Sequence, residues 1–196
     1  MEKNNLDPGL IQSEIQTSVS FTAFMTAVTI FFVGLLITQF KDLDSSIRIP
    51  ILFLIISTFG FLYATLIYSN ASGKVARLGK VNVDKDMILA NSLAEYMGLY
   101  FLVLAIPLVI NVAASDVFLR VATLIVVLGG LTIYHASGFS IMGRNFPKLH
   151  ILFLIIILLL GIFMFVMQAF SNLLTITSII TILLMVSLTF FAKKEY

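Results

Sequence analysis

Five apolar stretches occupy most of this 196-residue chain, and the last of them is long enough to cross a bilayer twice. A helix needs about 20 consecutive apolar residues to cross the hydrocarbon core of a membrane. These lengths predict an all-α, multi-pass membrane protein with six transmembrane helices in one bundle. The stretches cover Ile15–Phe40, Ile49–Gly73, Met87–Ser115, Val121–Gly143 and Leu149–Ala192.

The composition is that of a membrane helix bundle and not of a soluble domain. Hydrophobic residues make up 60% of the chain and charged residues 11%, with a mean hydropathy of +1.08, whereas a soluble domain carries about 25% charged residues. The net charge of +2 is small and dispersed, so we expect no nucleic-acid partner. The chain has no cysteine, which excludes disulfides and thiolate metal sites.

We expect three parts along the chain: a polar N-terminal segment over residues 1–15, a transmembrane domain over 16–192 and a tail over 193–196. Asp7 and Pro8 have the residue types of a helix N-cap and first position, so the N-terminal segment is either a short interfacial helix or a frayed terminus. The first apolar stretch is about twice as long as a signal-peptide core, and we expect it to be retained. The expected spans are 16–39, 49–70, 87–112, 117–140, 147–168 and 173–192. Pro50 is expected to open the second span and Pro147 the fifth.

The distribution of basic residues predicts the orientation. With six spans, the N-terminus, the loops after the second and fourth spans and the C-terminus share one side, and they hold nine of the twelve Lys and Arg residues. Cytoplasmic loops are enriched in these residues. We therefore expect a cell-membrane protein with both termini in the cytoplasm. The nine residues are Lys3, Lys74, Arg77, Lys80, Lys85, Arg144, Lys148, Lys193 and Lys194.

One short segment occurs twice. Residues Ile51–Ile56 recur as Ile151–Ile156, and a glycine follows each copy, Gly60 and Gly161. The recurrence fits two three-helix halves, which would be inverted relative to each other, as in many transporters. The alternative is chance, because a chain rich in Ile, Leu and Phe produces such matches without a repeat.

Glu95 is the principal candidate for a functional side chain. It lies about eight residues into its span, hence about 12 Å deep at 1.5 Å per residue. Ionisable residues at that depth are costly and face a bundle interior or a cavity. Asn91 precedes it by one turn, and a ridge of small residues runs beside it. Glu95 is expected to be a protonatable or cation-binding group, and the structural alternative is a neutral glutamic acid hydrogen-bonded across helices.

His135 and Tyr134 lie in the corresponding half of the fourth span, so Glu95 and His135 are able to meet. Such a pair would relay protons. The alternative is a histidine that only packs and hydrogen-bonds. A metal site built from Glu95, His135 and His150 matches no recognised spacing, so we expect no metal and no cofactor.

Three backbone positions are candidate hinges or kinks. Pro107 interrupts the third span and frees the carbonyl of Val103. Gly129 and Gly130 permit either a hinge or, as we favour, close packing of another helix. A stripe of small residues on the first span is likewise expected to receive a helix, within or between protomers; it comprises Ser20, Ala23, Ala27 and Gly34.

No motif of an intramembrane protease, a zinc peptidase or a nucleotide-binding enzyme is present, so we do not expect an enzyme. The favoured function is a small channel or transporter for an ion or small solute, with Glu95 as its site. The alternative is a non-catalytic subunit or scaffold of a membrane complex. The expected partners are membrane lipids and a second copy or a partner membrane subunit. A wet cavity at Glu95 would favour transport, and dry burial with a partner would favour the scaffold.

Overall fold

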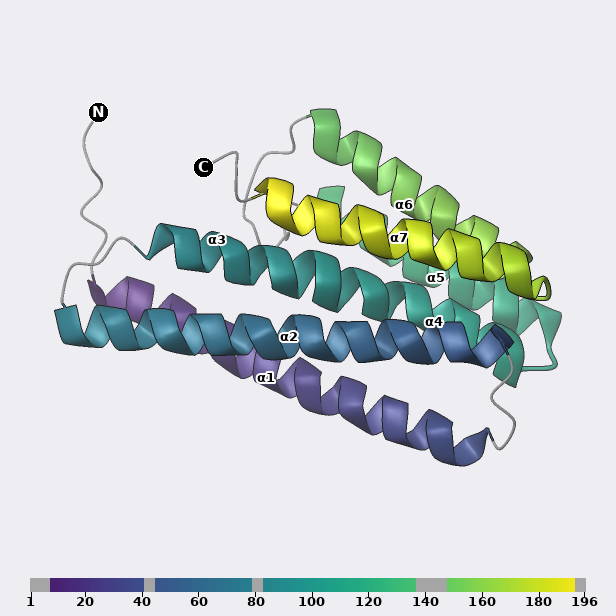
Figure 1. Cartoon of the computed structure of the whole chain (residues 1–196), viewed down its shortest axis with the longest axis horizontal. Coiled ribbons are helices and arrows are strands. Elements are labelled where there is room, and N and C mark those ends of the chain that lie inside the picture. Colours follow the sequence, from purple (N-terminus) through teal and green to yellow (C-terminus); the bar gives the residue numbers. More distant parts are fainter. Residues whose placement is uncertain (1–7, 41–44, 79–82, 137–147, 193–196) are drawn as a thin grey trace.

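The computed structural model describes residues 8–40, 45–78, 83–136 and 148–192, and within these ranges it is helical without strands. Helices α3, η1 and α4 follow one another without a break and form a single central rod (Figure 1). This confirms the prediction of an all-α bundle. The elements are α1 (Pro8–Gln39), α2 (Ser45–Leu78), α3 (Asp84–Ser92), the π-helical segment η1 (Leu93–Leu99), α4 (Tyr100–Ala113), α5 (Val117–Ala136), α6 (Lys148–Val166) and α7 (Ser171–Ala192).

Five helical rods in the described ranges are long and apolar enough to cross a membrane. The remaining helix, α6, corresponds to the predicted span 147–168 and is apolar over the shorter stretch Ile151–Val166. The count of six spans therefore stays a prediction. Several predicted features lie outside the described residues: most of the N-terminal segment, positions 41–44 of the first loop, the end of the fourth span, the helix start at Pro147 and the C-terminal tail.

The first three rods are longer than a bilayer requires. Helix α2 has 34 residues, about 51 Å, against a hydrocarbon core of about 30 Å. Helices α1, α2 and α3 extend past α5, α6 and α7 at the end of the bundle where α1 begins and α7 ends (Figure 1). Because α2 begins at Ser45, the prediction that Pro50 opens this helix is wrong: the proline lies inside it.

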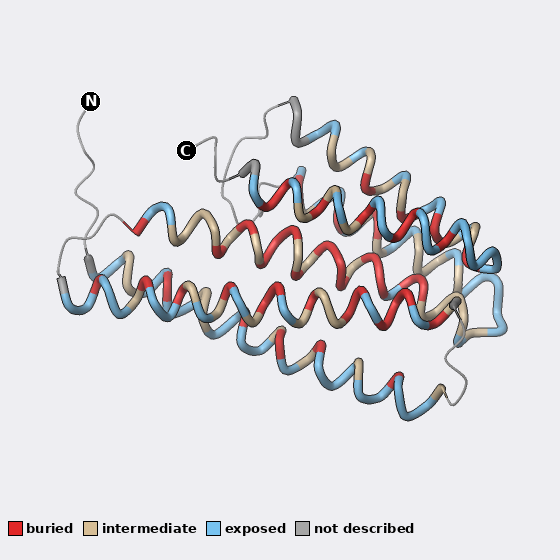
Figure 2. The backbone as a smooth tube through the Cα atoms, in the orientation of Figure 1, coloured by how far each residue is buried: buried red, intermediate tan, exposed pale blue. Residues whose placement is uncertain are grey.

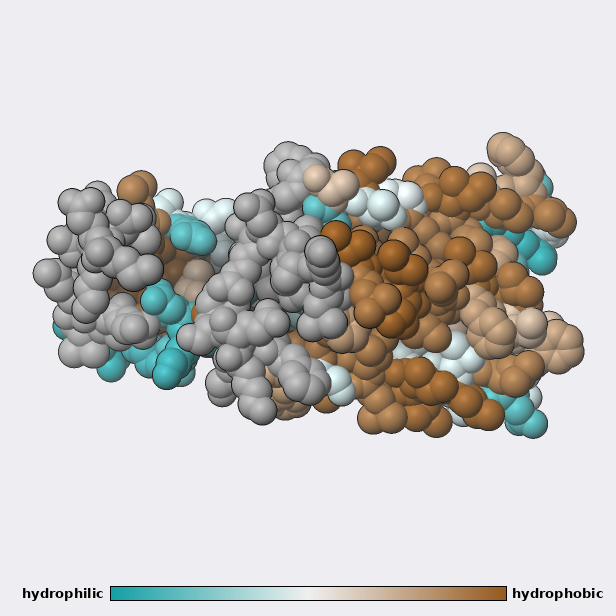
Figure 3. All heavy atoms as spheres, turned by 90° about the horizontal axis from the view of Figure 1, so that it is seen from above, coloured by the Kyte–Doolittle hydropathy of each residue, from teal (hydrophilic) through white to brown (hydrophobic). Residues whose placement is uncertain are grey.

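The central rod forms the core of the bundle. Helices α2, α5, α6 and α7 all contact it, and α1 packs along α2. Figure 2 shows buried residues following one another along this rod more continuously than along α1 or α5. Phe53 of α2 packs edge-on against Phe101 of α4, with ring centroids 5.0 Å apart. The coloured part of the face in Figure 3 is mostly hydrophobic, and hydrophilic residues gather toward both of its ends.

Threonine side chains join α1 to α2. The Thr58 hydroxyl donates to Thr29 Oγ1 over 2.9 Å, and the Thr65 hydroxyl donates to Thr22 Oγ1 over 2.8 Å. Thr22 in turn donates to the carbonyl of Ser18, one turn earlier. The predicted small-residue stripe of α1 lies on the other side, where all four of its residues are exposed. Among the described helices, none covers this stripe, so the expected contact between protomers stays a prediction.

Candidate functional site

The central rod changes its winding where Glu95 lies. Over Leu93–Leu99 the backbone is π-helical, and the Tyr100 N–H bonds to the Glu95 carbonyl, five residues back. Such turns are rare and occur frequently at functional sites. Widening the helix by one residue per turn changes the direction of the side chains on either side of it, so this segment helps to set where Glu95 points.

Two glycines allow α2 to lie directly against the π-helical segment. A Cβ added to Gly60 would lie 2.5 Å from the backbone carbonyl carbon of Met97, and one added to Gly98 would lie 2.7 Å from the Phe61 ring. Ser57 completes the contact by donating its hydroxyl to the Gly98 carbonyl over 2.7 Å. Small residues permit this close approach between membrane helices. The contact therefore requires glycine at both positions.

Glu95 and His135 meet inside the bundle. The Glu95 carboxyl Oε1 lies 3.7 Å from His135 Nδ1, and the two side chains are only 2% and 3% exposed. Glu95 comes from the central rod and His135 from the last turn of α5. A charge in such surroundings is costly unless an opposite charge or a hydrogen bond compensates it. The structure thus brings together the two side chains that the sequence places at matching depths.

Two tyrosines surround the His135 ring. Tyr100 hydrogen-bonds to His135 Nε2 through its hydroxyl, and their ring centroids are 5.4 Å apart. Tyr134 meets the same imidazole edge-on at 5.2 Å. The imidazole thus has Glu95 on its Nδ1 side and a phenol on its Nε2 side. Which nitrogen carries the proton follows from the protonation of these neighbours.

This arrangement is chemically suited to holding and passing protons. The Glu95 carboxyl group, the His135 imidazole and the Tyr100 phenol follow one another in space. An imidazole is able to accept a proton at one nitrogen and donate one from the other. An imidazolium beside a carboxylate, or a neutral imidazole beside a carboxylic acid, leaves the buried pair without net charge. Gain or loss of one proton would leave a net charge in an apolar interior. The pair is thus a site where a transferred proton or cation would have a large energetic effect.

Asn91 faces a different neighbour from Glu95. Its side-chain carbonyl accepts a hydrogen bond from the Tyr68 hydroxyl of α2, whereas Glu95 faces α5. The sequence placed Asn91 on the same helix face as Glu95. The structure connects Asn91 to α2 instead, so its direct contribution to the Glu95 site remains a prediction.

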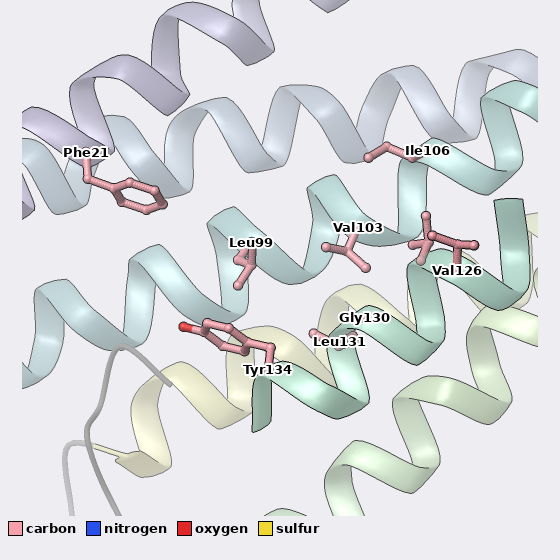
Figure 4. Close-up of a pocket in the computed structure, with 9 residues that line it drawn as sticks. Phe21, Leu99, Val103, Ile106, Val126, Gly130, Leu131 and Tyr134 are labelled. Atoms are coloured by element: carbon pink, nitrogen blue, oxygen red, sulfur yellow. The ribbon is translucent and has the colours of Figure 1, made fainter. Parts of the chain in front are cut away.

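An apolar groove of about 690 Å³ lies beside this cluster, between α1, the central rod and α5 (Figure 4). Tyr134 belongs both to the groove wall and to the surroundings of His135. Glu95 does not line the groove. The wet cavity that would favour transport is therefore not this groove, and Glu95 is buried with a partner.

The predicted hinge residues have different surroundings. Pro107 is buried inside α4, and the helix continues through it to Ala113. A Cβ added to Gly129 or Gly130 would meet nothing within 4 Å, so the close packing expected there is not made among the residues that the structure describes. Gly130 instead leaves space in the groove wall. A hinge at any of the three residues stays a prediction.

A second polar cluster, which no expected site residue indicated, surrounds Gln168. Gln168 is 4% exposed, and its Nε2 donates to the carbonyls of Ser46 and Leu108 over 2.9 and 2.8 Å. Its Oε1 accepts from Asn111 Nδ2 over 2.8 Å. Ser46 lies four residues before Pro50, so proline withholds the N–H that its carbonyl would otherwise receive. A proline inside a long helix was the available signal, and Gln168 supplies the replacement donor.

Comparison with protein-family models, with curated proteins and with solved structures finds no match for this chain. Among the residues that the structure describes, no three His, Asp or Glu side chains are grouped so as to hold a metal ion. The class is therefore defined by the fold: the helices are long and apolar enough to indicate a membrane protein.

Proposed function

We propose that the protein is a small membrane carrier or channel for an ion or small solute, in which Glu95 and His135 form the protonatable or cation-binding site. The observation that supports this most directly is the burial of an ionisable pair between the helices of an apolar bundle. Ionisable residues inside membrane spans mark ion pathways and proton relays. The π-helical backbone under Glu95 is a second feature typical of functional sites.

The burial of the pair favours a carrier over an open pore. Glu95 is 2% exposed, so an ion or proton from water reaches it only after helices separate. Carriers pass through such closed states when they alternate access between the two sides. The proposal includes no enzymatic reaction, and it places both termini in the cytoplasm of a cell-membrane protein, as the basic loops indicate.

The alternative is a non-catalytic subunit or scaffold that binds a second copy or a partner membrane protein. Two observations favour it: Glu95 is buried with a partner, and the small-residue stripe of α1 faces outward. In this alternative the Glu95–His135 contact only holds the central rod to α5. The stripe would receive a helix of the other protein.

Flux through liposomes distinguishes the two proposals. Purified wild type, Glu95→Gln and Glu14→Gln are reconstituted and assayed with a pH dye and a panel of cations. Glu14 is an exposed glutamate of α1, so it is the matched control. Flux that Glu95→Gln abolishes and Glu14→Gln retains supports the carrier. Absence of flux by folded wild type rejects it and favours the subunit, and unchanged flux in Glu95→Gln removes Glu95 from the mechanism.

A further inference from the structure

The groove beside Tyr134 has the size and lining of a ligand site. Its volume is about 690 Å³, and apart from the Tyr134 hydroxyl its lining side chains carry no polar atoms. Ligand pockets have volumes of about 300–1,000 Å³, mostly apolar walls and few polar groups. Figure 4 shows Val103 and Ile106 of the central rod on one side and Leu131 and Tyr134 of α5 on the other. The groove lies on helices that are expected to face hydrocarbon, so its natural occupant is apolar.

The dimensions of the groove match one leaflet of a bilayer. Its α5 wall runs over the nine residues from Val126 to Tyr134, a rise of about 12 Å, against about 15 Å for half of a hydrocarbon core. Tyr134 lies two residues before Ala136, where the described part of α5 ends. Tyrosine is enriched at membrane interfaces, where its hydroxyl meets the headgroup region. We therefore expect the polar end of the groove near the membrane surface and its apolar end toward the bilayer centre.

We propose that the groove binds one acyl chain of a bilayer phospholipid as a specific, resident lipid, with its headgroup at the Tyr134 end. The polarity of the groove fits this occupant, because its single hydroxyl lies where the ester region of a phospholipid lies. Gly130 provides the space, since a Cβ there would meet nothing within 4 Å. Through Tyr134, which contacts the His135 ring, the bound chain would lie against the wall of the Glu95–His135 site. This inference goes beyond the proposed function and does not depend on transport.

Photo-crosslinking in vesicles tests it. The protein is reconstituted in phosphatidylcholine vesicles that contain a phosphatidylcholine with a diazirine on one acyl chain, and crosslinked peptides are identified by mass spectrometry. The exposed face of α7 around Ile176 and Ile180 serves as the reference for lipid that is merely adjacent. We expect the groove walls, Leu99–Ile106 and Val126–Tyr134, to be labelled several-fold more than this face.

The two neighbouring glycines provide a matched pair of variants. Gly130→Leu fills the groove, whereas Gly129→Leu adds the same side chain to an equally open position outside the groove lining. We expect Gly130→Leu to reduce groove labelling to the level of the α7 face and Gly129→Leu to leave it unchanged. Val103→Phe fills the groove from the other wall. If Gly130→Leu does not fold, Val103→Phe replaces it, and we expect the same loss of groove labelling. Equal labelling of groove and α7 face in wild type, or groove labelling that survives filling, would overturn the proposal.

Discussion

The Glu95 carboxyl oxygen Oε1 lies 3.7 Å from His135 Nδ1, and the two side chains that make this contact are almost completely buried. They come from different helices, and each is held by its surroundings: Glu95 by a π-helical segment pressed against α2, and His135 by two tyrosines. The contact is therefore one of those that join the central rod to α5. Its energetic and functional consequences can be measured separately.

A double-mutant cycle should show that the stabilities contributed by Glu95 and His135 are coupled. We expect Glu95→Gln and His135→Asn each to lower the free energy of unfolding, and the double variant to lose less than their sum by about 1 kcal/mol, within the usual range for contacting residues. The reason is that either single change leaves its buried partner without compensation. The measurement is reversible unfolding in mixed micelles. Additive losses would show that the contact carries no interaction energy.

The contact between α2 and the π-helical segment should not tolerate a side chain at Gly60. In Gly60→Ala the new Cβ meets the Met97 backbone at 2.5 Å, which cannot be relieved by rotating a side chain. Overpacking of this kind costs about 1–3 kcal/mol, so we expect a clear fall in thermal unfolding temperature. Gly73→Ala is the control on the same helix, because its Cβ would meet nothing within 4 Å. Equal stability of the two variants would contradict the close approach.

Gln168 should contribute to stability although it lies in a short turn. Gln168→Leu removes two hydrogen bonds to backbone carbonyls and one from Asn111. Leaving buried polar groups without a partner costs about 1–3 kcal/mol each. Gln39→Leu changes an exposed glutamine at the end of α1 and should have little effect. Thermal unfolding in detergent compares the two, and a similar small effect of both would show that the cluster is energetically neutral.

The topology can be tested with single cysteines, because the chain has none of its own. Gly73 and Ser115 are exposed and lie at opposite ends of the central helices. We expect Gly73→Cys to react with a membrane-impermeant thiol reagent only from the cytoplasmic side and Ser115→Cys only from the other side. Labelling of both from the same side would exclude the predicted orientation and the number of spans on which it depends.

The sequence predictions that hold rest on two quantities: the length of each apolar stretch and the depth of a residue within it. The apolar stretches were sufficient to predict helices, because a chain in hydrocarbon must satisfy its backbone hydrogen bonds internally. Depth alone placed Glu95 and His135 at corresponding levels. Tyr100 was not selected, because a tyrosine in an apolar span looks like an ordinary core residue until its hydroxyl is seen on His135.

The predictions about glycine packing differ from the structure for another reason. Gly129 and Gly130 look like packing sites by residue type, yet a Cβ added to either would meet nothing within 4 Å. Gly60 is, by sequence, only the glycine that follows a recurring segment, yet it lies against the Met97 backbone. A glycine in a sequence indicates that close approach is permitted, and only the arrangement of helices determines whether it occurs.

The sequence by itself determined that the chain forms long apolar helices, and it singled out two ionisable side chains that those helices bury, Glu95 and His135. Both follow from local properties: the hydropathy of consecutive residues and the cost of a charge in hydrocarbon. The tertiary structure decided which groups meet. Glu95 faces His135, and Asn91 faces Tyr68. Gln168 donates to the Ser46 carbonyl, which receives no hydrogen bond from Pro50 because proline has no N–H. These pairings depend on the rotation and offset of whole helices, and packing between side chains far apart in the sequence sets both.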